Sequence, residues 1–302
     1  MDEGRASRTA IATAYFRAHH YGHANPKIFE DSLAGALLRV QEREGLEKFF
    51  LERLATLNPG LAGSCADRAT LVGHALRGLV VVLARARYTE DRLAEAIRDG
   101  VLQYVVIGAG LDTFALRRPD LQDRLRIIEI DHPATQASKR LRIGDAGLTL
   151  PPNLHFAPAD LEKESIAEVL SRAPYDPAQP AFFSWLGVTM YLTEDAIGAT
   201  LRSLRSTAAA GSQLVFDYLD RAVLAPENQS ATRSSIFETV RRIGESMIFG
   251  FDPSALGAEL AAQGFRLLES LGPEDLEKLY FAGRADGLRP TGSAHLARVA
   301  VA

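Results

Sequence analysis

The chain has 302 residues, of which 47% are hydrophobic and 24% charged, the balance of an ordinary globular protein with one large α/β domain or two small ones. A net charge of −4 gives no electrostatic basis for binding nucleic acid or an anionic membrane, and a single cysteine, Cys65, excludes an internal disulfide. The longest apolar run, Leu79–Ala84, is too short to span a bilayer, and no signal-peptide pattern opens the sequence, so we expect a cytoplasmic protein.

The first part of the chain, up to about residue 98, is predicted to be helical. A turn-forming patch beginning at His19 interrupts the pattern. His19, His20 and His23 raise the question of a metal site, but no cysteine or evident acid accompanies them, so we predict no bound metal. After the first helix, further helices are predicted over Asp31–Val40, Leu46–Leu57 and Cys65–Leu83.

Two arginines, Arg85 and Arg87, follow these helices. Residues two apart cannot share a helix face, so one of them is expected to point inward. The planar guanidinium fits a carboxylate bidentately, which makes the inward arginine a candidate for the carboxylate of a methionine-derived cofactor. The alternative is a pair of arginines favoured by the dipole at a helix C-terminus.

The stretch 102–117 organises the rest of the chain. Leu102–Ile107 is apolar and rich in β-branched residues, which predicts a strand buried on both faces. The pattern breaks at Gly108-Ala109-Gly110, and a helix is expected to start at Leu111. A strand, a glycine turn and a helix form the cofactor-binding unit of doubly wound α/β folds. Position 113 is Thr, so the third glycine of the dinucleotide fingerprint is missing, and a purely structural turn remains an alternative.

Acidic residues follow the next two predicted strands. Arg126–Asp131 ends in Asp131, 21 residues after Gly110, near the spacing at which a carboxylate meets ribose hydroxyls. The next strand leads to Asp160 and Leu161. A glycine turn and two acids at successive strand ends predict a ligand crevice at the carboxyl edge of a parallel sheet.

The remaining strands are predicted at 181–187, 214–218, 265–270 and 295–301, the last two as a closing hairpin. This gives an N-terminal helical cap region at 1–98 and an α/β core at 99–302. An insertion at about 221–262 is either a substrate lid or a packing helix. Its apolar residues at helical spacing are Phe237, Val240, Ile243, Met247, Ile248 and Phe249.

Four motifs, VVIGAGLDTFALR, IIEIDHP followed by SKR, PADL, and WLGVTMYLT, resemble the leucine carboxyl methyltransferase family, a branch of the class I S-adenosylmethionine (SAM) methyltransferases. The resemblance covers the chain from about Arg8 onward and implies a bacterial member. It implies a Rossmann-like, mostly parallel seven-stranded sheet with an N-terminal cap. The family includes enzymes that methylate the C-terminal leucine carboxylate of a protein phosphatase. It also has many bacterial members, some of which act on carboxyl or hydroxyl groups of polyketide-type metabolites.

The resemblance also implies roles for individual residues. A family motif of arginine, aromatic and acid favours Arg87 over Arg85 for the cofactor carboxylate, and FRAHH suggests Arg17 beside it. Leu186 stands where many members have an acid that faces the adenosine. Trp185 and Tyr191 are expected near the methyl donor or, alternatively, in the core. The expected cofactor contacts are Arg17, Arg87, Gly108, Ala109, Gly110, Asp131, Asp160 and Leu161. Tyr191 is an expected acceptor contact, and so, independently of the resemblance, are Tyr280 and Arg284, because they lie in a basic and aromatic segment that looks exposed.

The motifs contain no evident catalytic dyad, and no catalytic residue is assigned. A carboxylate acceptor is already ionised at neutral pH and needs no base. A hydroxyl acceptor would need one, and His132, His155 or Asp217 could serve. We therefore expect a SAM-dependent O-methyltransferase acting on a carboxylate of a small metabolite. The alternatives are a hydroxyl O-methyltransferase, a nicotinamide oxidoreductase, which the missing glycine disfavours, and a non-catalytic SAM-binding or partner-binding protein.

Overall fold

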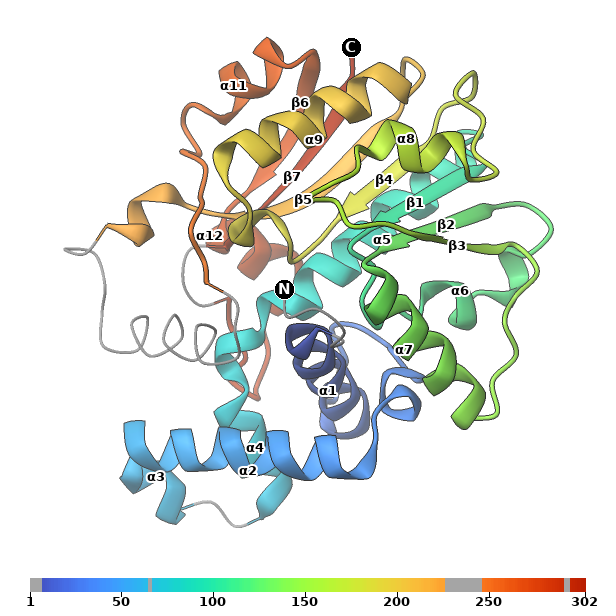
Figure 1. Cartoon of the computed structure of the whole chain (residues 1–302). Coiled ribbons are helices and arrows are strands. Elements are labelled where there is room, and N and C mark those ends of the chain that lie inside the picture. Colours follow the sequence, from blue (N-terminus) through green and yellow to red (C-terminus); the bar gives the residue numbers. More distant parts are fainter. Residues whose placement is uncertain (1–6, 65–66, 226–245, 291–293) are drawn as a thin grey trace.

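A computed structural model describes residues 7–64, 67–225, 246–290 and 294–302, and its centre is a seven-stranded sheet (Figure 1). The strand order is β3-β2-β1-β4-β5-β7-β6, and β7 alone runs antiparallel to its neighbours, β5 and β6. The predicted doubly wound, mostly parallel sheet and its closing hairpin are confirmed. The strands are β1 (Gln103–Ile107), β2 (Arg126–Asp131), β3 (Leu154–Pro158), β4 (Phe182–Trp185), β5 (Gln213–Leu219), β6 (Phe265–Leu271) and β7 (Ala294–Val301).

Helices cover both faces of the sheet (Figure 1). Every residue of β1 is buried, and its side chains alternate between two apolar clusters. Tyr104 and Val106 join the cluster on one face, and Val105 and Ile107 join the other. The first face carries α5 (Val81–Arg98), α6 (Phe114–Arg117) and α7 (Pro133–Asp145), and the second carries α8 (Ile166–Ser171), α9 (Glu194–Thr207) and α11 (Leu256–Ala262).

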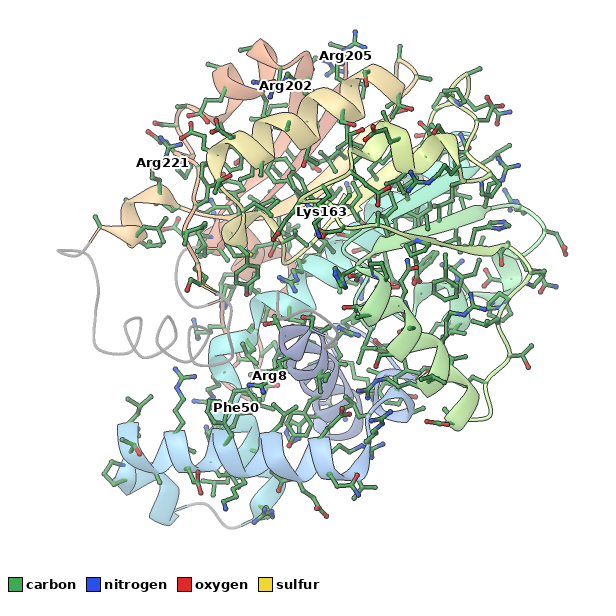
Figure 2. The ribbon with its side chains drawn as sticks, in the orientation of Figure 1. Arg8, Phe50, Lys163, Arg202, Arg205 and Arg221 are labelled. Atoms are coloured by element: carbon green, nitrogen blue, oxygen red, sulfur yellow. The ribbon has the colours of Figure 1, made fainter. Side chains whose placement is uncertain are left out.

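The N-terminal region packs against one end of this layer. Phe50 points from α2 toward α1 (Figure 2) and belongs to the same apolar cluster as Tyr104 of β1, so the cap and the sheet share one core. The elements of the cap are α1 (Arg8–His23), the 3₁₀ turn η1 (Ala34–Leu37), α2 (Val40–Leu57), α3 (Pro59–Ser64), α4 (Arg68–Ala75) and the 3₁₀ turn η2 (Arg77–Leu79).

Two helix predictions in this region are wrong. Between residues 31 and 40 only η1 forms, because the carboxylate of Asp31 accepts hydrogen bonds from the backbone N–H groups of Leu33 and Ala34 and so makes a turn. The helix predicted to end near residue 83 is broken at η2, and α5 continues to Arg98. It continues because Leu93, Ala96 and Ile97 form a buried stripe at helical spacing.

The insertion after β5 is only partly described. Residues 226–245, which include Phe237, Val240 and Ile243, lie outside the described residues. Met247–Phe249 were predicted to be helical, and this prediction is wrong. The backbone N–H groups of Ile248 and Phe249 instead donate to the carbonyl of Met190, at 2.8 and 3.3 Å.

Where the chain is described, no single helix has the length and apolar character needed to cross a membrane. The stretches Arg68–Ala75 and Arg77–Arg98 meet that test of length and composition only together, and they join at a bend of 48°.

Candidate functional site

The predicted glycine turn lies at the carboxyl end of β1. Gly108 and Gly110 have φ values of 72° and 52°, which L side chains rarely adopt. A Cβ atom on Gly108 would lie 2.6 Å from Val188, and one on Gly110 would lie 3.0 Å from Ala10 of α1. The turn therefore requires glycine both for its backbone conformation and for the close approach of the cap and of the segment that follows β4.

Asp131 ends β2 and faces this turn. The N–H of Gly110 donates to one carboxylate oxygen, and the N–H of His132 donates to the other at 2.7 Å. Burial raises the pKa of Asp131, and the two backbone hydrogen bonds oppose that rise. The acid is therefore fixed beside the glycine turn, as the spacing of the motifs predicts.

Asp160 and Leu161 follow β3, the next strand in the sheet. Asp160 accepts a hydrogen bond from the N–H of Glu162 at 3.1 Å and forms an ion pair with Lys163 at 2.9 Å (Lys163 is labelled in Figure 2). The hydrogen bond from Lys163 is the main reason that the pKa of Asp160 is lowered. Because β1, β2 and β3 are neighbours, the glycine turn and both acids lie along one edge of the sheet.

The inward arginine is Arg85, whereas Arg87, the residue predicted to bind the cofactor carboxylate, lies on the outer side of α5. The Arg87 side chain is 47% exposed, pairs with Asp91 at 2.9 Å, and lies against the ring of Tyr280. Arg85 is 13% exposed, and its Nη1 donates to Asp217 of β5 at 2.7 Å. Helix α5 thus directs Arg85 toward the carboxyl ends of the strands, and it turns Arg87 to its outer side.

Asp217 connects Arg85 to the turn that follows β4. One carboxylate oxygen accepts from Arg85 and the other accepts from the N–H of Gly187 at 2.6 Å, while the Asp217 carbonyl accepts from the hydroxyl of Thr189 at 2.6 Å. A Cβ on Gly187, whose φ is 71°, would lie 2.6 Å from Arg85 Nη2. Asp217 is 1% exposed. Each of its carboxylate oxygens already accepts a hydrogen bond from a neighbour, from Arg85 and from Gly187.

The aromatic residues near β4 divide between the core and the half-buried surface. Trp185 is 1% exposed and belongs to the apolar cluster beneath α8 and α9, so it is a core residue. Tyr191 is half-buried beside Met190, Leu219 and Val223. Leu186, which replaces the family acid, packs against the cluster on the cap side of the sheet.

Three other predicted site residues have protein partners. Arg17 donates to Asp31 at 2.8 Å and to the carbonyl of Leu111 at 2.7 Å. It therefore adjoins the glycine turn, but both of these hydrogen bonds go to other residues of the protein. The Tyr280 hydroxyl donates to Asp91 at 3.1 Å, and Arg284 pairs with Asp286. Among the described residues, neither Tyr280 nor Arg284 contacts the glycine turn.

The histidines near the start of the chain serve packing. The rings of His19 and His23 stack with their centroids 4.4 Å apart, and His20 Nε2 accepts from the N–H of Ile28 at 2.8 Å. Burial lowers the pKa values of His19 and His20 to about 4. No group of metal-ligating side chains is found in the described ranges.

Surface hollows lie away from this edge of the sheet. One of about 200 Å³ separates α9 from α11, and one of about 440 Å³ lies beside the edge strand β3 between α7 and α8. His155, the second residue of β3, lines the second hollow near the amino end of that strand, whereas the glycine turn lies at the carboxyl ends of the strands.

The strand order, with its reversed strand β7 and with the glycine turn and the two acids at the ends of β1, β2 and β3, defines the class I methyltransferase fold. A Streptomyces avermitilis protein of the DUF574 family shares it with a TM-score of 0.60, at 14% identity and over 99% of both chains. A "putative methyltransferase" from Thermobifida fusca matches with a TM-score of 0.55 and 18% identity, over 99% of this chain and 96% of that one. These two likenesses concern the fold alone.

The sequence identifies the family. The pattern described as "Leucine carboxyl methyltransferase" matches residues 10–205. The "Putative S-adenosyl-L-methionine-dependent methyltransferase YktD" of Bacillus subtilis (strain 168) is 31% identical over 298 residues, which cover 98% of each chain. The chain therefore belongs to the leucine carboxyl methyltransferase family and is a SAM-dependent methyltransferase.

The residues at this edge of the sheet fit this cofactor chemically. Among the three nitrogens of the Arg85 guanidinium, only Nη1 has a hydrogen-bond partner in the described residues. Nε and Nη2 can therefore donate to a carboxylate. Asp131 and Asp160 supply acceptors for hydroxyl and amino groups at the adjoining strand ends. The pairing of Arg85 with Asp217 was not predicted from the sequence. Its signal was the acid inside the apolar strand LVFDY, because a buried carboxylate needs a partner.

Proposed function

We propose that the cofactor lies across the carboxyl ends of β1, β2, β3 and β4. In this arrangement Arg85 binds the methionyl carboxylate, Asp131 accepts from the ribose hydroxyls, and Asp160 with Leu161 receives the adenine. The positions of these residues support the order, because Arg85 reaches the ends of β4 and β5 while Asp131 and Asp160 follow β2 and β3. Val188 and Ala10 lie over the glycine turn and would exclude water from it.

We propose further that the enzyme is an O-methyltransferase for a carboxylate of a small metabolite. The observation that carries this proposal is the bonding of Asp217, an acid of β5 whose two carboxylate oxygens accept from Arg85 and from the N–H of Gly187 and are thereby directed away from an acceptor. The bound cofactor supplies the methyl group on a sulfonium. A carboxylate acceptor is already anionic, so the protein has only to align it and exclude water. The family description, leucine carboxyl methyltransferase, agrees with this acceptor class.

A hydroxyl acceptor is the second candidate, and the position of His132 beside Asp131 favours it. This residue adjoins Asp131, and its Nδ1 accepts from the N–H of Ala134 at 3.2 Å, which leaves Nε2 for another contact. The imidazole could remove a proton from a hydroxyl that reaches the crevice.

The pH dependence of turnover separates the two acceptor classes. With a carboxylate acceptor, found by screening carboxylic acids against SAM and detecting the ester by mass spectrometry, the rate should change by less than about twofold between pH 8 and pH 6. A group with a pKa near 4 stays ionised across that range, so no proton has to be removed. A hydroxyl acceptor would lose rate toward pH 6, because its base would gain a proton.

The control for this experiment is the binding of S-adenosylhomocysteine (SAH), the demethylated product, measured by calorimetry at the same pH values. A steep loss of rate at pH 6, with SAH affinity and folding unchanged, would contradict carboxyl methylation and favour the hydroxyl acceptor.

A further inference from the structure

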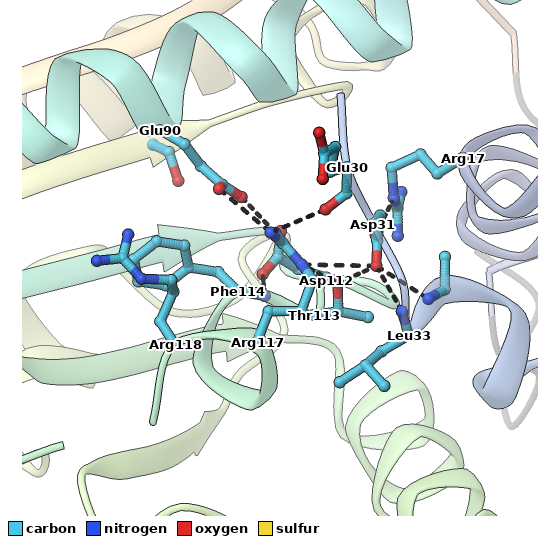
Figure 3. Close-up of polar contacts among 12 residues, drawn as sticks. Arg17, Glu30, Asp31, Leu33, Glu90, Asp112, Thr113, Phe114, Arg117 and Arg118 are labelled. Carbon is cyan, nitrogen blue, oxygen red and sulfur yellow. Dashed lines mark hydrogen bonds and ion pairs between the residues drawn. The ribbon is translucent and has the colours of Figure 1, made fainter. Parts of the chain in front are cut away.

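Asp31 is the centre of a buried polar network between the cap and the loop that follows the glycine turn (Figure 3). It is 1% exposed and lies in the segment between α1 and η1. Its Oδ2 accepts from Arg17 Nε at 2.8 Å, and its Oδ1 accepts from the hydroxyl of Thr113 at 2.7 Å. Leu33 and Ala34 donate their backbone N–H groups to the same Oδ1, at 3.2 and 2.9 Å. Both carboxylate oxygens thus accept hydrogen bonds, and the donors come from separate parts of the chain.

The charges of the network balance within it. Arg117 lies 3.5 Å from Asp31, forms an ion pair with Glu90 of α5, and donates to the Thr113 hydroxyl at 2.9 Å. Two guanidinium groups, Arg17 and Arg117, therefore face two carboxylates. Burial alone would raise the pKa of Asp31, but these arginines hold it below its usual range, so the acid is ionised.

The network reaches the cofactor-binding turn through Arg17. The residue has two anchors, since its Nε donates to Asp31 while its Nη2 donates to the carbonyl of Leu111, the residue that follows Gly110. Thr113 is bound to the same carboxylate two residues further on. The two ends of the segment 111–113 are therefore fastened to two cap residues that bind each other, Leu111 to Arg17 and Thr113 to Asp31.

We propose that Asp31 and Thr113 are positioning residues, which hold the Gly108–Gly110 turn in its cofactor-binding form by fastening it to the cap. Thr113 stands where a dinucleotide site has its third glycine, and its hydroxyl makes a hydrogen bond to Asp31 that glycine could not make. Because Ala10 of α1 lies against Gly110, a cofactor that fixes the turn also fixes the docking of α1. The coupling is reciprocal, so loosening the cap weakens cofactor binding.

Substitutions at position 113 test the proposal without removing a charge. Thr113→Val deletes the hydroxyl at nearly constant volume, whereas Thr113→Ser keeps it. SAH affinity is measured by calorimetry, and hydrogen exchange of α1 is measured with and without SAH. The valine variant loses the hydrogen bond that the hydroxyl donates to Asp31 and the one it accepts from Arg117. It should bind SAH roughly threefold to tenfold more weakly and lose the SAH-induced protection of α1. The serine variant should restore both. Asp31→Asn should show a larger loss than Thr113→Val, if that variant folds.

The matched control is Glu42→Gln. Glu42 joins α2 of the cap to Arg142 of α7 through another partly buried ion pair, which makes no contact with the glycine turn among the described residues. This variant should destabilise the cap and leave SAH affinity within about twofold. The proposal is overturned if Thr113→Val binds SAH with wild-type affinity and retains the protection of α1. It is also overturned if Glu42→Gln weakens SAH binding as much as Thr113→Val, since the effect would then be one of cap stability in general.

Discussion

Replacement of Arg85 by alanine is expected to weaken SAH binding at least about tenfold. The proposed contact is a charge-assisted, bidentate one, in which each hydrogen bond contributes roughly 1.5–3 kcal/mol, and 1.4 kcal/mol corresponds to a factor of ten in affinity. Arg85→Lys should restore only part of the affinity, because an ammonium group cannot reproduce the planar fork. Isothermal calorimetry on each purified variant measures the change.

Two controls separate binding from folding in this experiment. Arg87→Ala removes a half-exposed arginine that pairs with Asp91, and it should leave SAH affinity within about twofold. Adenosine, which lacks the methionyl carboxylate, should bind wild type and Arg85→Ala equally. If adenosine and SAH lose affinity to the same extent, Arg85 acts through the fold. If Arg87→Ala produces the larger loss, the assignment of the carboxylate to Arg85 is wrong.

Replacement of Asp217 by alanine is expected to lower the free energy of unfolding by about 3–5 kcal/mol, because removing one partner of a buried ion pair leaves the other uncompensated. The variant loses the partner of Arg85 and the acceptor for the N–H of Gly187 together. Asp217→Asn keeps a carbonyl acceptor for Gly187 and should be destabilised less. Denaturant unfolding followed by circular dichroism measures both changes.

The exposed pair Lys48–Glu52 provides the control for Asp217. Its atoms are 3.9 Å apart on the surface of α2, and Glu52→Ala should change stability by no more than about 0.5 kcal/mol. An Asp217→Ala variant that unfolds at the same denaturant concentration as Glu52→Ala would contradict the role of Asp217 as the buried link between Arg85 and the turn after β4.

The sheet and its crevice could be predicted from the sequence because their signals are local. A buried strand, a glycine turn and acids at strand ends each occupy a few consecutive residues, and a parallel sheet brings successive strand ends to one edge. Gly108, Gly110 and Asp131 accordingly lie together in the structure. The turn requires glycine at two positions, so Gly108 and Gly110 were enough to locate it in the sequence.

The choice between Arg85 and Arg87 could not be made locally. Residues two apart differ by about half a turn of helix, and only the packing of α5 on the sheet decides which of them faces inward. That packing places Arg85 beside Asp217, which is 132 residues away in the chain. The partnership of Asp31 with Thr113 spans 82 residues and was missed for the same reason. The helix predicted over 31–40 does not form because the Asp31 carboxylate also accepts hydrogen bonds from the backbone of its own turn.

A crystal structure of the protein with SAH is the most direct test of the proposed cofactor arrangement. The account predicts the homocysteine carboxylate within hydrogen-bond distance of Arg85 Nε and Nη2, and both ribose hydroxyls on the Asp131 carboxylate. The adenine should lie beside Asp160 and Leu161. A carboxylate bound by Arg87 or Arg17, or a ribose without contact to Asp131, would contradict it.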